Sequence, residues 1–174
     1  MLHCLSRILV IATGVASVAV NGLAMGFDVV TLASSNQSQA PYRFRNAPIE
    51  ITFDITARDL TNRMREAHVG PPIKLALEEV TANRPPGYLL KVFMGVVSSD
   101  PSLRAARFLG YLSLYDLQQQ RLLFDVTEPI GDLLTVGGGD LNLVVTIRTA
   151  EAAESRELPD SAEILIGRAS FIAQ

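Results

Sequence analysis

The chain contains a single cysteine, Cys4, and two histidines, His3 and His68, in 174 residues. One cysteine excludes an internal disulfide framework and a cysteine-based zinc site. His3 lies in the apolar N-terminal stretch, and no glycine-x-serine-x-glycine motif is present, so the sequence offers no convincing nucleophile–histidine triad. The absence of disulfides leaves the cellular compartment open.

Lysine is also scarce. The only lysines among the 15 basic residues are Lys74 and Lys91, and the net charge of the chain is −3. No basic stripe is interleaved with aromatic residues, and we therefore expect no nucleic-acid partner. At 48% hydrophobic and 19% charged residues, the composition is that of an ordinary globular protein. The length suits one domain with a sizeable core, preceded by a leader.

The first 24 residues have the pattern of an export leader. Arg7 gives a positive start, residues 8–20 are uncharged and largely apolar, and a small-x-small cleavage site closes at Ala24, before Met25. The run is shorter than the roughly 20 residues that span a bilayer, although residues 21–27 would extend it to that length. We expect a signal peptide or membrane anchor at 1–24, and a protein that is exported (periplasmic or secreted) or membrane-anchored. A misassigned start within a longer gene and a buried segment are the alternatives.

Residues 25–47 are expected to form a linker that could include an edge strand, and residues 48–174 the domain proper. Apolar and polar residues alternate over 49–55 and 141–147, which predicts half-buried strands, and residues 88–97 predict a central strand because both faces are apolar. The fold class that follows is mainly β: an antiparallel β-sandwich of seven or eight strands with two short helices. Parallel architecture is disfavoured because strands and helices do not alternate.

The stretch 107–149 reads as strand, turn, strand, short helix, glycine turn and strand. Alternation over 108–115 places Phe108 on one face of its strand and Tyr111 and Tyr115 on the other. The simplest interpretation of the tyrosines is that of strand residues with solvated hydroxyls, and the weaker alternative is a surface that contacts a partner.

Local signals predict how several elements begin and end. Thr127 is expected to cap the second helix, and the glycines at 137–139 to end it, because glycine adopts a left-handed backbone cheaply. This glycine run leads from helix to strand, the reverse of a phosphate loop. Gly167 suggests a bulge in the closing strand. Glu78 and Glu79 are adjacent in a strand, so we expect opposite faces and no acid–base pair.

Several short motifs together resemble the C-terminal domain of the tyrosinase and polyphenol oxidase family. The resemblance covers roughly residues 48–173 and implies a non-catalytic β-sandwich that covers the active-site entrance of a copper-bearing domain and holds the enzyme latent. The motifs that carry it are Phe108-Leu109-Gly110, Phe124-Asp125-Val126-Thr127, Asp132-Leu133-Leu134, Leu143-Val144-Val145-Thr146 and Ile166-Gly167-Arg168.

The catalytic domain of that family holds two coppers with six histidines, whereas this chain has two histidines in all. We therefore expect no enzyme activity, no catalytic or metal-binding residue and no cofactor. His68, at the end of a predicted helix, is expected to be a dipole contact or simply exposed.

Three functional hypotheses remain, and a small enzyme ranks below them. The first is a domain that packs on, or shields, a separately encoded tyrosinase-type copper oxidase, since a leader stands where the family has its histidine-bearing domain. The second is an exported or membrane-anchored β-sandwich that binds an unknown ligand. The third is a fragment of a larger tyrosinase-like gene. Tyr111 and Tyr115 are the candidate partner surface, and contact with a membrane is expected only through the N-terminal segment.

Overall fold

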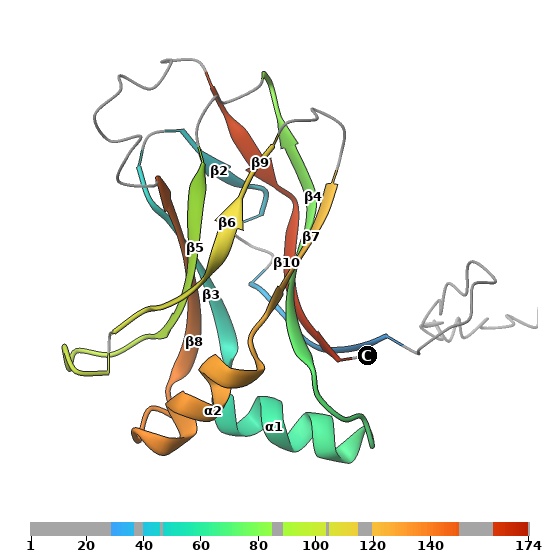
Figure 1. Cartoon of the computed structure of the whole chain (residues 1–174), viewed down its shortest axis with the longest axis vertical. Coiled ribbons are helices and arrows are strands. Elements are labelled where there is room, and N and C mark those ends of the chain that lie inside the picture. Colours follow the sequence, from blue (N-terminus) through green and yellow to red (C-terminus); the bar gives the residue numbers. More distant parts are fainter. Residues whose placement is uncertain are drawn as a thin grey trace, which may run out of the picture.

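A computed structural model describes residues 29–36, 40–45, 47–84, 89–103, 105–114, 120–149 and 162–173. These residues form two antiparallel sheets that face each other, and two short helices close one end of the sandwich (Figure 1). The predicted fold class is therefore confirmed. The leader at 1–24, with its cleavage site at Ala24 and Met25, lies outside the described residues. Within the described ranges, no helix is long and apolar enough to cross a membrane.

One sheet has four strands in the order β3–β8–β5–β6, and we call it the four-stranded sheet. Its strands are β3 (Ile49–Thr56), β8 (Asn142–Thr149), β5 (Leu90–Val96) and β6 (Arg107–Leu112). The strand that was predicted to be central, over residues 88–97, is β5, which pairs with β8 on one side and β6 on the other.

The second sheet has six strands and is built around β4 (Ile73–Ala82). Leu75 pairs with Phe171 of one neighbour and with Phe124 of the other, so β4 lies between them. The other strands are β1 (Val30–Ser34), β2 (Tyr42–Phe44), β7 (Gln120–Asp125), β9 (Ile164–Ile166) and β10 (Arg168–Ala173).

The described residues thus form ten strands, more than the seven or eight that the sequence predicted. Two of them, β1 and β2, lie within the stretch 25–47 and pair with β10 and β9 at the edge of the six-stranded sheet. The predicted closing strand is divided at Gly167 into β9 and β10, which confirms the irregularity that this glycine indicated. Each difference comes from short strands at an edge or beside a break.

The core lies between the two sheets. Leu143, Val145 and Ile147 of β8 are all completely buried, as their alternation predicted. Across the sandwich, the rings of Phe53 and Phe171 lie 4.5 Å apart between centroids. The largest fully buried side chains come from both sheets and both helices: Phe44, Phe53, Phe171, Ile51, Leu60, Leu75, Leu77, Leu90, Met94, Leu112, Leu133 and Leu143.

Helix α1 (Ala57–Glu66) begins at Thr56, whose hydroxyl accepts the N–H of Asp59 at 3.0 Å. It ends in a turn in which Val69 donates its N–H to the carbonyl of Met64 at 3.2 Å. His68 has a φ of 55° there, the left-handed conformation that follows many helices. This histidine is exposed, and its Nδ1 lies 2.9 Å from the carbonyl oxygen of Glu66.

Helix α2 (Thr127–Thr135) begins differently from the prediction. Its N-cap is Val126, with no side-chain capping bond, so the assignment of Thr127 as the cap was wrong. The Thr127 hydroxyl instead accepts the N–H of Ile73 in β4 at 3.0 Å, which ties the helix to the sheet. At the other end Gly137 has a φ of 84°, and this confirms the glycine stop.

Helix α1 is joined to the turn that follows α2 by backbone and side-chain contacts. The N–H of Arg58 donates to the carbonyl of Gly139 at 2.9 Å, and the guanidinium of Arg58 forms two hydrogen bonds with the Asp140 carboxylate. The hydrogen bond from Arg58 holds the pKa of Asp140 below its ordinary value. The contact fixes α1 against the turn that leads from α2 into β8.

A bulge in β4 changes what its outer surface presents. Leu77 and Val80 are both fully buried, and the register with β7 shifts between them. Glu78 and Glu79 therefore both lie outside, and Glu79 has a positive φ of 56°. Both carboxylates lie 3.9 Å from Arg168, so the prediction that they occupy opposite faces was wrong because strict alternation fails at a bulge.

Candidate interaction surface

A second bulge, in β6, brings two aromatic rings to the outer face of the four-stranded sheet. Gly110 pairs with Val92 and Phe108 pairs with Phe93, which leaves Leu109 as the extra residue. Phe108 and Tyr111 consequently project from the same face, with ring centroids 5.1 Å apart. Alternation predicted opposite faces for these two side chains, and that prediction was wrong for the same reason as in β4.

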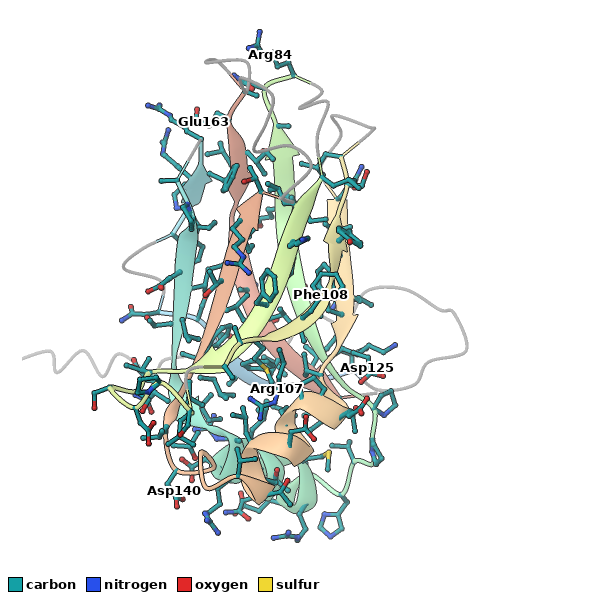
Figure 2. The ribbon with its side chains drawn as sticks, turned by 60° about the vertical axis from the view of Figure 1, so that its left-hand side comes forward. Arg84, Arg107, Phe108, Asp125, Asp140 and Glu163 are labelled. Carbon is teal, nitrogen blue, oxygen red and sulfur yellow. The ribbon has the colours of Figure 1, made fainter. Side chains whose placement is uncertain are left out.

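Both rings are unusually open to solvent for their size. Phe108 is 49% exposed and Tyr111 is 54% exposed. Phe108 lies part-way along the sandwich, between the helical end, where Asp140 lies, and the opposite end, where Arg84 and Glu163 lie (Figure 2). The rings are therefore held on a sheet rather than on a loop, and burial of both would remove a large apolar area from water.

The neighbouring strands extend the cluster. The Phe93 ring of β5 lies 5.6 Å from that of Phe108, and the guanidinium carbon of Arg148 in β8 lies 4.3 Å above the centre of the Phe93 ring. This distance is within the range of a cation–π contact. We call Phe93, Phe108, Tyr111 and Arg148 the aromatic patch; three adjacent strands supply it.

A shallow hollow of about 350 Å³ adjoins the aromatic patch on the same sheet. Its walls combine apolar groups with a carboxylate and two hydroxyls: Glu50, Gly95, Val96, Val97, Ser98, Ala106, Val144 and Thr146. Thr146 pairs with Phe93 across the sheet, so the hollow and the patch are continuous. The outer face of this sheet therefore has two projecting aromatic rings with a hollow beside them.

Of the two tyrosines predicted as a partner surface, Tyr111 lies in the aromatic patch, and Tyr115 lies outside the described residues. The sequence did not identify Phe93, Phe108 or Arg148 as companions of Tyr111. Gly110 carried the one local signal, because an isolated glycine within a strand often marks a bulge. The pairing of β5 with β6 and β8 joins residues far apart in the chain and has no local signal.

The structure describes no side-chain cluster suited to metal chemistry. In the described ranges, no three histidine, cysteine, aspartate or glutamate side chains come together as a metal-binding group. The glycines at 137–139 lead from α2 into β8, as the sequence indicated, and not from a strand into a helix. Among the described residues, the aromatic patch and the hollow beside it are the candidate functional site.

Comparison with known proteins gives similarity to solved structures and no match in sequence. No protein-family model matches the chain, and no curated protein matches it. The chain is similar to a solved structure described as recombinantly expressed latent aurone synthase, a polyphenol oxidase, with 12% sequence identity and a TM-score of 0.46. The match covers 80% of this chain and 27% of the aurone synthase chain, so the similarity spans about a quarter of the length of that protein. The sequence motifs resemble the same family.

Proposed function

We propose that this chain is a non-catalytic β-sandwich that packs on a tyrosinase-type copper oxidase and shields its active site. The observation that carries the proposal is the aromatic patch, which projects from three paired strands. Tyrosine and arginine dominate the binding energy of many protein interfaces, and phenylalanine is enriched in interface cores. The family resemblance of the sequence supplies the kind of partner.

The contact would use the patch and the hollow together. Phe108 and Tyr111 can enter a recess of the partner, while an apolar side chain of the partner can enter the hollow beside Val144 and Ala106. Ring pairs of this kind add about 0.5–1.5 kcal/mol beyond the area they bury. A partner that lies across the four-stranded sheet would cover both features at once.

The oxidase would be a separate chain, and this affects the strength that the interface needs. In a single chain, a tether supplies a high effective concentration and a weak contact suffices. Two separate chains have no such help, so shielding should depend on the concentration of this protein. An oxidase encoded next to it would be the natural partner to test.

The test is an activity titration. The catalytic domain of the tyrosinase-type oxidase encoded nearest in the same genome is assayed for catechol oxidation with increasing amounts of the chain. We expect saturable inhibition, and we expect Phe108→Ser together with Tyr111→Ser to abolish it. Arg121→Ser, on the other sheet, is the control and should inhibit like the wild type.

Inhibition that the double variant retains, or no inhibition at any concentration, would contradict the proposal. The second result would favour an exported or membrane-anchored module for another ligand, or a fragment of a larger gene. On its own, the purified chain should bind no copper pair and oxidise no catechol, because it has two histidines in all. Two coppers per chain by elemental analysis would refute the non-catalytic assignment.

A further inference from the structure

The outer face of the four-stranded sheet carries both signs of charge around its rings. Arg148 lies over Phe93, and no carboxylate among the described residues forms an ion pair with it. Glu50, on β3, is exposed, and no basic residue in the part of the chain that the structure describes forms an ion pair with it. Each of these charges therefore remains available to a group from outside the chain.

The register of the sheet fixes where these charges stand. Glu50 pairs with Thr146, and Arg148 lies two residues further along β8 on the same face. Phe93 pairs with Thr146 from the other side, so the cation, the acid and the rings occupy neighbouring positions. Arg148 leans toward the rings rather than toward Glu50, which is only a diagonal neighbour.

We infer that this face pairs with the same face of a second copy of the chain. In a two-fold interface the same patch serves both partners, so the patch must be complementary to itself. Here, Arg148 of each copy meets Glu50 of the other, and the rings of the two patches pack beside these two ion pairs, on the side of β5 and β6. A face with charge of one sign would repel its own copy.

The size of the face sets the strength of the contact. Four strands about 4.8 Å apart and about six residues long give a face of about 20 Å by 20 Å, or about 400 Å² per copy. Stable interfaces bury about 800 Å² per partner, so the dimer is weak and depends on concentration. It covers the same patch as the proposed oxidase contact, and the two states exclude each other. The inference does not require the oxidase.

Sedimentation velocity of the full chain over a range of concentrations tests this inference, and charge reversal makes the test specific. Arg148→Glu and Glu50→Arg should each raise the dissociation constant of the dimer about tenfold or more. The double variant carries both reversals and should recover the wild-type constant to within about threefold, because both ion pairs are rebuilt with opposite sign. Arg65→Glu, on α1, is the control and should leave the constant unchanged.

The inference is overturned if the wild-type chain stays monomeric at all concentrations, if the single reversals have no effect, or if the double variant is no better than the single ones. Association through the apolar N-terminal residues would persist in all four variants, and this result also refutes the inference. Melting curves check that the exposed substitutions leave the fold intact. Inhibition of an oxidase is measured separately, so either proposal can fail without the other.

Discussion

The outer surfaces of β4 and β6 are each shaped by a bulge, yet they carry different chemistry. In β4 the bulge exposes Glu78 and Glu79, and Arg121 lies 3.1 Å from the Glu78 carboxylate, with Arg168 near both acids. In β6 the bulge exposes Phe108 and Tyr111. The same backbone irregularity therefore presents charge on one sheet and aromatic rings on the other.

The difference lies in how each surface is satisfied. Carboxylates and arginines on β4, β7 and β10 form ion pairs with each other. These side chains are also well solvated, so exposure of this surface to water costs little free energy. The rings on β6 lie against each other, and Phe108 also lies against Phe93, which has the guanidinium of Arg148 above it; about half of each β6 side chain stays in water. Exposed apolar clusters of this kind mark contact sites more often than exposed ion pairs do.

The largest effect is expected in the core that both surfaces share. Val145→Asp should place an uncompensated charge between the sheets and prevent cooperative folding, at a cost of several kcal/mol. Val144→Asp is the matched control, because Val144 faces outward into the hollow and should tolerate the charge. If Val145→Asp melted cooperatively near the wild-type temperature, the assigned inner face of β8 would be inverted.

The next effect concerns the β4 bulge. A Cβ added at Gly167 would lie 2.8 Å from the Cβ of Glu79, an atom that cannot move without the backbone. Gly167→Ala should lower the free energy of unfolding by about 1–3 kcal/mol. Gly70→Ala meets nothing within 4 Å and serves as the control. Equal chemical-denaturation midpoints for the two variants would show that β9 and β10 are not held against this bulge.

A smaller effect is expected at the β6 bulge, where two readouts can be compared. A Cβ at Gly110 would lie 3.2 Å from two atoms of the Phe124 ring, and Gly110 has a φ of +157°. Gly110→Ala should cost about 1–2 kcal/mol and also weaken contacts made by the aromatic patch. Thermal melting measures the stability of the fold, and sedimentation velocity measures association through the aromatic patch. Loss of stability with unchanged association would mean that the bulge does not position the rings.

Replacing the two residues with strained backbone conformations by glycine should raise the stability of the fold rather than lower it. Glu79 and His68 have φ values of 56° and 55°, which cost a residue with a side chain about 1–2 kcal/mol. Glu79→Gly relieves this strain but loses an exposed ion pair of small value, and His68→Gly relieves it at a helix end. Both should melt at or above the wild-type temperature, with His68→Gly the more stable. A lower melting temperature for His68→Gly would show that the histidine has a role other than ending the helix.

The smallest effect is the pH dependence of the Arg58–Asp140 contact. Since the pKa of Asp140 is lowered in the folded chain, the contact stabilises the fold above the ordinary carboxyl pKa of 3.8 and loses this effect as the pH falls through the lowered value. Asp140→Asn should therefore melt slightly below the wild type at pH 6, and the difference should vanish in acid. A difference that grows in acid would contradict the assigned direction of the shift.

The sequence predicted most of the fold because its signals are local. Alternation at 141–147 and the glycine stop after α2 depend on neighbouring residues. The role of Thr127 could not be predicted in this way, because its hydroxyl binds Ile73, which lies 54 positions away. A competing tertiary hydrogen bond took the place of the local cap.

The candidate surface was predicted only in part for a related reason. Tyr111 was identified, but its neighbours come from strands whose register is set by pairing across the sheet. A single bulged residue shifts every later side chain to the other face, so one unrecognised irregularity was enough to separate Phe108 from Tyr111 in the prediction. Gly110 and Gly167 carried the same signal, and the sequence interpretation used it at Gly167 alone.

Hydroxyl-radical footprinting tests the central claim most directly, because it reports which face is covered whatever the partner. The chain is oxidised at low concentration, at high concentration and with the oxidase, and modification of Phe108 and Tyr111 is compared with that of Leu123, which is 42% exposed on β7. We predict protection of Phe108 and Tyr111 in both associated states and constant modification of Leu123. Protection of Leu123 with unchanged oxidation of the aromatic patch would contradict the account.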